Sequence, residues 1–156
     1  MSGNNLPQNP RLAAAFPRFY HQDINGPDAG LCAFYACRHF LGKLDFATFQ
    51  LAAVRMYMRL MKVADAEKMV QEGNDPAIVD AVLAGVATGK RTVQLQDYQN
   101  KSRVLIALAN KPHFKTCLFI AGRGWFDYDS LWVRPFPIQD FGAFLKHNPG
   151  SRYWIA

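Results

Sequence analysis

The sequence is poor in cysteine, in charged residues and in long apolar runs, and each shortage excludes a class of protein. Cysteine occurs only three times in 156 residues, which argues against a disulfide framework and for a reducing compartment. No apolar run approaches the ~20 residues of a membrane-spanning helix. The start, MSGNNLPQNPR, lacks the charged segment and apolar core of a secretory signal. We therefore expect a protein of the cytoplasm with no membrane partner.

What is present is typical of a globular domain, because half of the residues are hydrophobic and only 19% are charged. The formal net charge is +6, which raises the question of nucleic-acid binding. The basic residues are scattered, however, and the only adjacent pair is Lys90-Arg91. No Walker loop, zinc-finger spacing or aromatic RNA-binding motif is found. The sequence thus predicts no nucleic-acid partner, no metal and no cofactor, and it leaves the oligomeric state open.

Hydrophobic patterns predict helices first and strands afterwards, which is an α+β order with no βαβ alternation. Residues 1–15 are predicted to form a flexible tail, and residues 16–156 a single domain. Helices are expected over residues 31–41, 46–63, 65–71 and 76–86, and near 138–147. Strands are expected over 91–98, 114–121, 125–128 and 152–156. Residues 102–110 fit either a short helix or a buried strand, and helix is favoured because Asn100 can cap it and Pro112 follows its end.

One short stretch, NGPDAGLCAFYACRHFLG, carries the first chemical hint. A turn-prone loop runs directly into an apolar helix that has Cys32 in its first turn. The partial positive charge of a helix N-terminus favours a thiolate. By itself the feature is weak, because a cysteine in this position is more often a small buried hydrophobe.

Two further features strengthen the hint. His113 stands at the entry to the first strand of a predicted hairpin, and the sequence WFDYDS follows on the return strand. Because side chains alternate along a strand, Asp127 and Asp129 point the same way. An acid there can lie beside His113 and orient its ring, as the third member of a catalytic triad does. The hairpin register favours Asp129, with Asp127 as the alternative.

These elements resemble papain-like cysteine peptidases, and most closely the Josephin-type deubiquitinases. The matching positions are Leu31-Cys32-Ala33 at the helix start, His113-Phe114, and the strand Trp125-Phe126-Asp127-Tyr128-Asp129-Ser130-Leu131. The resemblance implies a papain-like fold, with N-terminal helices packed on a C-terminal antiparallel sheet. It also implies that Cys32 is the nucleophile, His113 the general base and Asp129 the orienting acid. The middle of the chain, residues 43–110, matches nothing in that family.

The chain departs from the family at the oxyanion hole, where an amide is expected five or six residues before the cysteine. Those positions hold Gly26 and Pro27. Asn25 and Gln22 are the amide candidates, with Asn25 favoured because it is closer to Cys32 and precedes a tight turn. A backbone N–H of the first helical turn is expected to supply the other donor.

A Cys-His-Asp site performs acyl transfer, and the resemblance favours cleavage of ubiquitin or a ubiquitin-like protein from a protein substrate. Small papain-like chains without disulfides also resemble bacterial effectors and toxins. The first alternative is therefore a glutamine deamidase or protease delivered into the cytosol of a host or target cell. The second alternative is a non-catalytic module that binds a protein partner. The intact Cys, His and Asp residues count against the second alternative.

Overall fold

The computed structural model describes residues 15–23, 25–72, 75–86, 91–92, 98 and 101–156. Along the chain the elements are α1 (Cys32–Leu41), α2 (Phe46–Tyr57), α3 (Val63–Glu72), α4 (Ala77–Gly85), β1 (Arg91–Thr92), β2 (Arg103–Leu108), β3 (Phe114–Ile120), β4 (Gly124–Tyr128), β5 (Phe136–Ile138), α5 (Phe141–His147) and β6 (Gly150–Ile155). The predicted α+β class, with helices first and strands later, is confirmed.

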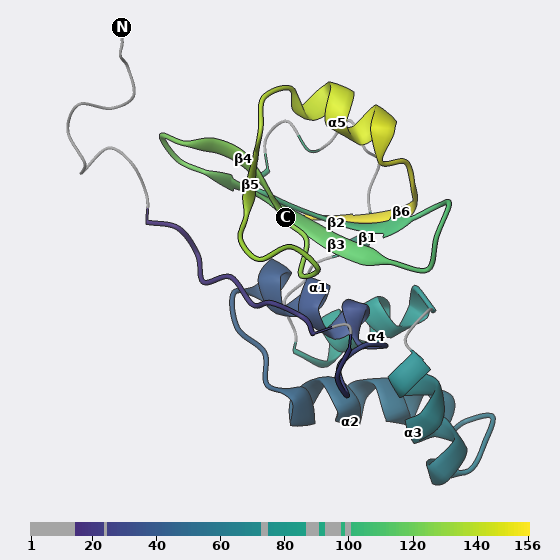
Figure 1. Ribbon diagram of the computed structural model, residues 1–156. Helices are drawn as coiled ribbons and strands as arrows, with labels where there is room; N and C mark the ends of the chain where they lie inside the picture. Colours follow the sequence, from purple (N-terminus) through teal and green to yellow (C-terminus); the bar gives the residue numbers. More distant parts are fainter. Residues whose placement is uncertain (1–14, 24, 73–74, 87–90, 93–97, 99–100) are drawn as a thin grey trace, which may run out of the picture.

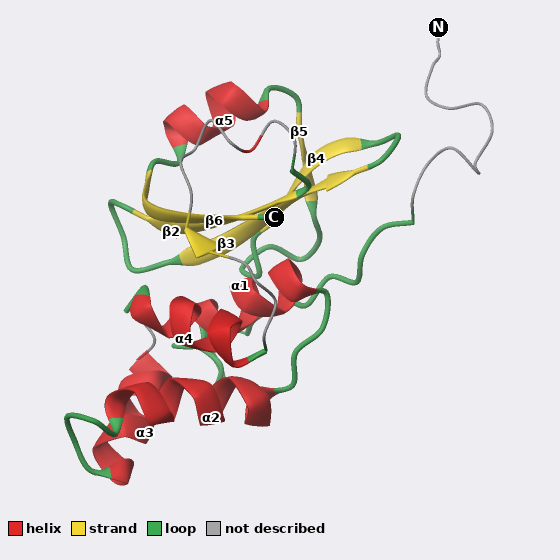
Figure 2. Cartoon of the chain, turned by 180° about the vertical axis from the view of Figure 1, so that it is seen from behind, coloured by secondary structure: helices red, strands yellow, loops and turns green. Residues whose placement is uncertain are grey.

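The strands form one sheet in the order β1-β6-β2-β3-β4-β5, and every neighbouring pair is antiparallel. Figure 1 shows α5 on one face of the sheet and α1 and α4 on the other, with α2 and α3 beyond them. Figure 2 shows the same layering from behind. The sheet is therefore covered on both faces. Cys32 lies at the start of α1, His113 directly before β3 and Asp129 directly after β4.

Helix α1 is buried on nearly all sides, because apolar residues occupy most positions around it. Phe34, Cys37 and Phe40 are all buried. The helix is joined to the sheet by the Thr116 hydroxyl, which donates to the Ala36 carbonyl at 2.7 Å. It ends at Gly42, whose φ of 87° lies in the left-handed region and suits glycine. The predicted helix end is thus confirmed.

The helix expected at residues 102–110 is wrong, because Arg103–Leu108 form strand β2 in the middle of the sheet. All residues from 104 to 107 are buried. Leu105 and Ala107 pack with the helices on one face, whereas Val104 and Ile106 pack with α5 on the other. A strand covered on both faces reads as a continuous apolar run, which a pattern of this length cannot distinguish from a buried helix.

Other boundaries differ by a turn or more. Helix α2 ends at Tyr57 rather than at Val63, and the polypeptide turns before α3 begins. Helix α5 begins at Phe141 after the Asp140 cap, because the residues before it form β5. Of the strand expected at 91–98, Arg91–Thr92 form β1 and 93–97 lie outside the described residues. The expected tail lies outside them too, except for residue 15.

Within the described part of the chain, no helix has both the length and the apolar character needed to cross a membrane.

Candidate active site

Cys32 is the first residue of α1, directly after the turn that brings the chain into the helix. Its side chain is nearly buried, with 6% of the residue exposed. The thiol Sγ lies 3.9 Å from the Pro112 carbonyl oxygen, so it faces the end of the β2–β3 connection. The fold therefore places the thiol in the first helical turn and next to the segment that carries the histidine.

His113 closes the connection between β2 and β3. Its N–H donates to the Lys111 carbonyl at 2.8 Å, and its carbonyl accepts from the Leu108 N–H at 3.0 Å. These two bonds fix the backbone at the start of β3. The ring is buried, and its Nε2 lies 2.8 Å from Asp129 Oδ1. The Cys32 thiol also interacts with this histidine.

Asp129 follows the last residue of β4 and is positioned by the register of the hairpin. Thr116 pairs with Tyr128 and Cys117 with Asp127, so the residue after Tyr128 lies opposite Lys115, two positions after His113. Asp129 Oδ1 also accepts the Leu131 N–H at 3.1 Å. The acid that contacts His113 is thus Asp129 and not Asp127, as the sequence predicts.

The protonation of this pair follows from its surroundings. Burial by itself lowers the pKa of His113, but the hydrogen bond to Asp129 and the neighbouring Cys32 outweigh it and raise the pKa to about 9. For Asp129, burial raises the pKa, but the hydrogen bond and charge of His113 outweigh it and lower the pKa below its usual value. At neutral pH the arrangement therefore favours an imidazolium against a carboxylate.

Asp127 has a different partner. Its Oδ2 lies 3.1 Å from Lys115 Nζ, and both side chains are buried. Burial raises the pKa of Asp127, although the Lys115 cation acts in the opposite direction. Sequence analysis missed Lys115. The available signal was a single charged residue in an apolar strand, on the same face as the two aspartates.

Gln22, a candidate for the oxyanion hole, is buried and its amide is already engaged. Nε2 donates to the carbonyls of Asp28 at 2.8 Å and Ala29 at 3.2 Å. Oε1 accepts the Ser130 hydroxyl at 2.8 Å, and the Gln22 N–H donates to the Ser130 carbonyl. Gln22 therefore joins the loop before Cys32 to the segment after Asp129. As an oxyanion donor it would have to release a loop carbonyl.

Asn25, the favoured candidate, lies exposed in the turn, and its backbone N–H donates to Asp23 Oδ1 at 2.9 Å. The turn is closed by the Leu31 N–H, which donates to the Asp28 carbonyl at 3.0 Å. The Tyr35 hydroxyl, on the second turn of α1, donates to Asp28 Oδ2 at 2.6 Å. The loop is thus fixed through Asp28 and Gln22, while the Asn25 side chain is exposed to solvent.

The other histidines have separate roles. His39 is buried two turns along α1, where its Nε2 accepts the Tyr20 N–H at 2.8 Å. Burial and the neighbouring Arg38 lower its pKa to about 4. His21 is exposed, and its Nδ1 lies 2.7 Å from the Trp132 carbonyl. His147 is the last residue of α5, as predicted for a cation near a helix C-terminus.

The other two cysteines are core residues, as predicted. Cys37 and Cys117 are both fully buried, and burial raises the pKa of each thiol well above its usual value. Both thiols therefore remain protonated, and neither shares Cys32's place at a helix N-terminus.

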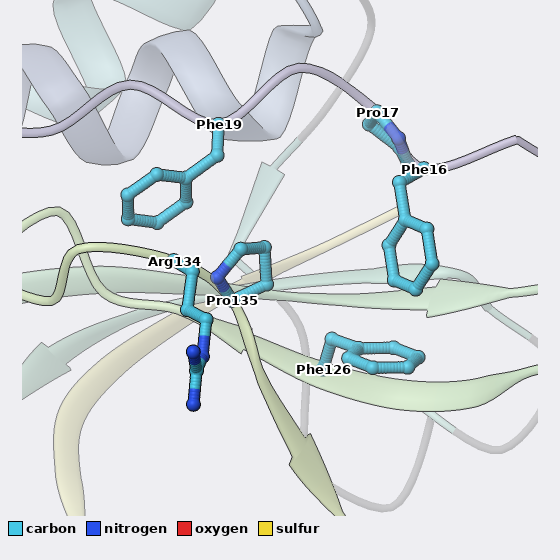
Figure 3. Close-up of a pocket in the computed structure, with 6 residues that line it drawn as sticks. All are labelled: Phe16, Pro17, Phe19, Phe126, Arg134 and Pro135. Atoms are coloured by element: carbon cyan, nitrogen blue, oxygen red, sulfur yellow. The ribbon is translucent and has the colours of Figure 1, made fainter.

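A separate pocket of about 410 Å³ lies between the N-terminal segment and the sheet. Figure 3 shows Phe16, Pro17 and Phe19 facing Phe126 and Pro135, with Arg134 at the side. The lining offers no nucleophile and no acid–base pair. This pocket therefore adds no catalytic group to the cluster of Cys32, His113 and Asp129.

Comparison with protein-family models, with curated proteins and with solved structures gives no significant match. The case for a function therefore rests on the residues of the site and on their geometry.

Proposed function

We propose that this protein is a cysteine hydrolase of papain-like architecture, with Cys32 as nucleophile, His113 as general base and then acid, and Asp129 as the residue that orients the ring. The observation that carries the proposal is the double engagement of His113. One ring nitrogen is 2.8 Å from a buried carboxylate, and the ring interacts with a thiol in the first turn of a helix. A nucleophilic thiol, a histidine base and an acid that orients the histidine together form a catalytic triad.

The mechanism follows from these contacts. In the reactive state the Cys32 proton resides on His113, as an imidazolium, and the Cys32 thiolate attacks the carbonyl carbon of the scissile bond. The tetrahedral intermediate collapses when the His113 imidazolium protonates the leaving amine, which leaves an acyl group on Cys32. A water molecule, deprotonated by His113, then releases the acid and restores the thiol. Asp129 stabilises the imidazolium in both halves of this cycle.

The arrangement of the elements supports the papain-like part of the proposal. The thiol lies on the central helix α1, and the histidine and the acid come from the start of β3 and the end of β4. The segments that carry the resemblance to Josephin-type deubiquitinases, residues 31–33, 113–114 and 125–131, are the ones that form the site.

For the substrate we propose a protein that carries ubiquitin or a ubiquitin-like modifier, cleaved at the isopeptide bond. The motif around Trp125–Leu131 is the basis for this choice. The surface beside the site agrees with a macromolecular substrate, because Leu131, Trp132 and Val133 follow Asp129 and are all exposed, Val133 by 77%. Exposed apolar residues next to one another are typical of a surface that binds another protein.

A ubiquitin probe with a C-terminal propargylamide tests the proposal directly, since it forms a covalent bond only with a cysteine that attacks the ubiquitin C-terminus. The wild type is expected to gain the mass of the probe, and Cys32→Ala is expected to gain none. Cys117→Ala is the matched control and should label like the wild type. Rapid alkylation of Cys32 without labelling by the probe would refute the ubiquitin assignment and leave a hydrolase or deamidase of another substrate. An unreactive Cys32 would refute the enzyme itself.

A further inference from the structure

A buried cation lies directly behind the candidate triad. Lys115 belongs to β3, and only 5% of its surface is exposed. Its Nζ is 3.1 Å from Asp127 Oδ2 and 3.8 Å from Asp129 Oδ2. On its other side it lies over the Phe144 ring of α5, 4.9 Å from the ring centroid. A buried lysine is costly unless its charge is paired, so this ion pair is part of how the site is built.

Asp129 divides its two oxygens between different partners. Oδ1 accepts from His113 and from the Leu131 N–H, whereas Oδ2 faces Lys115. The result is a row of four buried groups, His113, Asp129, Lys115 and Asp127, whose charges alternate in sign. In such a row the Lys115 cation weakens the attraction of Asp129 for the His113 imidazolium, and the Asp127 carboxylate in turn weakens the effect of Lys115 on Asp129.

We propose that Lys115 is a positioning residue: held by Asp127, it fixes the second oxygen of Asp129 and moderates the pull of that carboxylate on the His113 ring. The importance of this role rests on the proposed function, in which His113 moves the proton, but the electrostatic effect itself does not require turnover.

The direction of each effect can be worked out. Without the Lys115 cation, Asp129 attracts the imidazolium more strongly, so His113 should hold its proton to higher pH. Without the Asp127 charge, Lys115 neutralises Asp129 more fully, so His113 should lose its proton at lower pH. Removal of both charges should cancel.

Among the residues that the structure describes, no other charged group that packs on this row disturbs the comparison. From α1 the Cys32 thiol faces His113, and His39 is neutral at working pH because its pKa is lowered to about 4. Helix α5 presents the Phe144 ring, while its charged residues Lys146 and His147 are exposed. The remaining neighbour on β3, Cys117, has its pKa raised by burial and stays protonated.

The test is an NMR titration of His113 in the full chain, with its ring signal assigned by its loss in His113→Gln. The variants are Lys115→Met, Asp127→Asn and the double variant. Lys115→Met should move the His113 midpoint up and Asp127→Asn should move it down, each by ~0.5–1 pH unit. The double variant should return to within ~0.3 unit of the wild type.

Shifts of the same sign in the two single variants, or a midpoint that stays fixed in both, would overturn the proposal. A merely structural role predicts no opposed pair of shifts. If Lys115→Met does not fold, the isosteric Asp127→Asn decides by its sign alone, because a fixed or raised midpoint refutes the proposal. Failure of the ubiquitin probe to label a reactive Cys32 would instead refute the proposed ubiquitin substrate, and an unreactive Cys32 would refute the proposed enzyme; both outcomes leave these shifts unaffected.

Discussion

Three thiols in this chain share a chemical group but not a chemical environment. Cys37 lies on the same helix as Cys32, five residues further on, and Cys117 lies in the sheet; both are fully buried. Burial raises the pKa of each of these two thiols well above its usual value. Cys32 instead interacts with the His113 imidazole and is the first residue of helix α1.

We therefore expect Cys32 to be alkylated by iodoacetamide at pH 6, with Cys37 and Cys117 unmodified over the same time. The thiolate is the reactive form, and only Cys32 has surroundings that stabilise it. Peptide-resolved mass spectrometry over a series of pH values measures the three rates in one sample, and Cys37 serves as the internal control. Alkylation of Cys32 that is no faster than that of Cys117 would contradict the assignment of the nucleophile.

Substitution of the two aspartates on one face of the hairpin should have sharply different effects on kcat. Asp129 contacts His113 directly, whereas Asp127 contacts Lys115. Asp129→Ala is expected to lower kcat by up to ~10⁴-fold, the cost of removing a group that orients a catalytic histidine. Asp127→Asn keeps the shape of the side chain and should stay within ~10-fold of the wild type. A crippled Asp127→Asn beside a near-normal Asp129→Ala would reverse the roles.

At the scale of elements, the loop before α1 decides whether Cys32 is held in place. Gln22 joins this loop to Ser130 through buried hydrogen bonds. Gly30 closes the loop against α3, because a Cβ at Gly30 would lie 1.9 Å from the Gln71 backbone carbonyl oxygen. The loop is thus fixed from two sides, by a glutamine and by a close backbone approach that only glycine permits.

Kinetics and stability together distinguish the roles of the two loop amides. Gln22→Ala should lower the free energy of unfolding by ~1–3 kcal/mol or more, because it leaves buried carbonyls and a hydroxyl without partners. Asn25→Ala, at an exposed position, should leave stability unchanged and lower kcat by ~10²–10³-fold if its amide supplies an oxyanion donor. Thermal unfolding and kcat are measured on both variants. An Asn25→Ala variant with unchanged kcat would remove Asn25 from the mechanism.

The sequence predicts some elements well and others poorly, for physical reasons. The hairpin β3–β4 is predicted nearly to the residue, since two runs of β-favouring residues flank a Gly-Arg-Gly turn. Strand β2 was missed because tertiary contacts cover both of its faces, which erases the alternation that identifies a strand. The contact of Asp129 with His113 followed from the register, but Lys115 did not, because its burial depends on α5 covering the sheet.

At the scale of the whole molecule, the N-terminal segment holds the layers together. It crosses from the pocket at Phe16 to the loop at Gln22, and Figure 1 shows it running along α1 beside the sheet. Its contacts include the Tyr128 hydroxyl, which donates to the Pro17 carbonyl at 2.8 Å, and the Tyr20 N–H, which donates to His39. His39 must be neutral to accept the second of these bonds, so the attachment of the N-terminal segment to α1 depends on pH.

Two histidines with opposed shifts predict how the stability of the fold depends on pH. In the unfolded chain both have a pKa of ~6.5. The pKa of His39 is lowered to about 4 by burial and by Arg38, so the unfolded state binds a proton that the folded state refuses, and stability falls as pH drops from ~6.5 towards 4. The lowered pKa of Asp129 adds to this acid loss, and the raised pKa of Asp127 opposes it.

His113 acts at the other end of the range. Its pKa is raised to about 9, because Asp129 and Cys32 together outweigh the effect of burial. Its contribution to stability is complete below ~6.5 and is lost as pH rises through 9. A change of pKa from ~6.5 to about 4 or about 9 corresponds to a contribution of about 3 kcal/mol to the free energy of unfolding. The free energy of unfolding should therefore be greatest near pH 6.5–7 and fall on both sides, as measured by urea unfolding from about pH 4.5 to 8, below the range in which the buried Cys37 and Cys117 thiols also lower stability. His39→Gln should flatten the acid side alone and His113→Gln the alkaline side alone, whereas a profile that keeps both slopes in either variant would show that other groups set the stability of this fold.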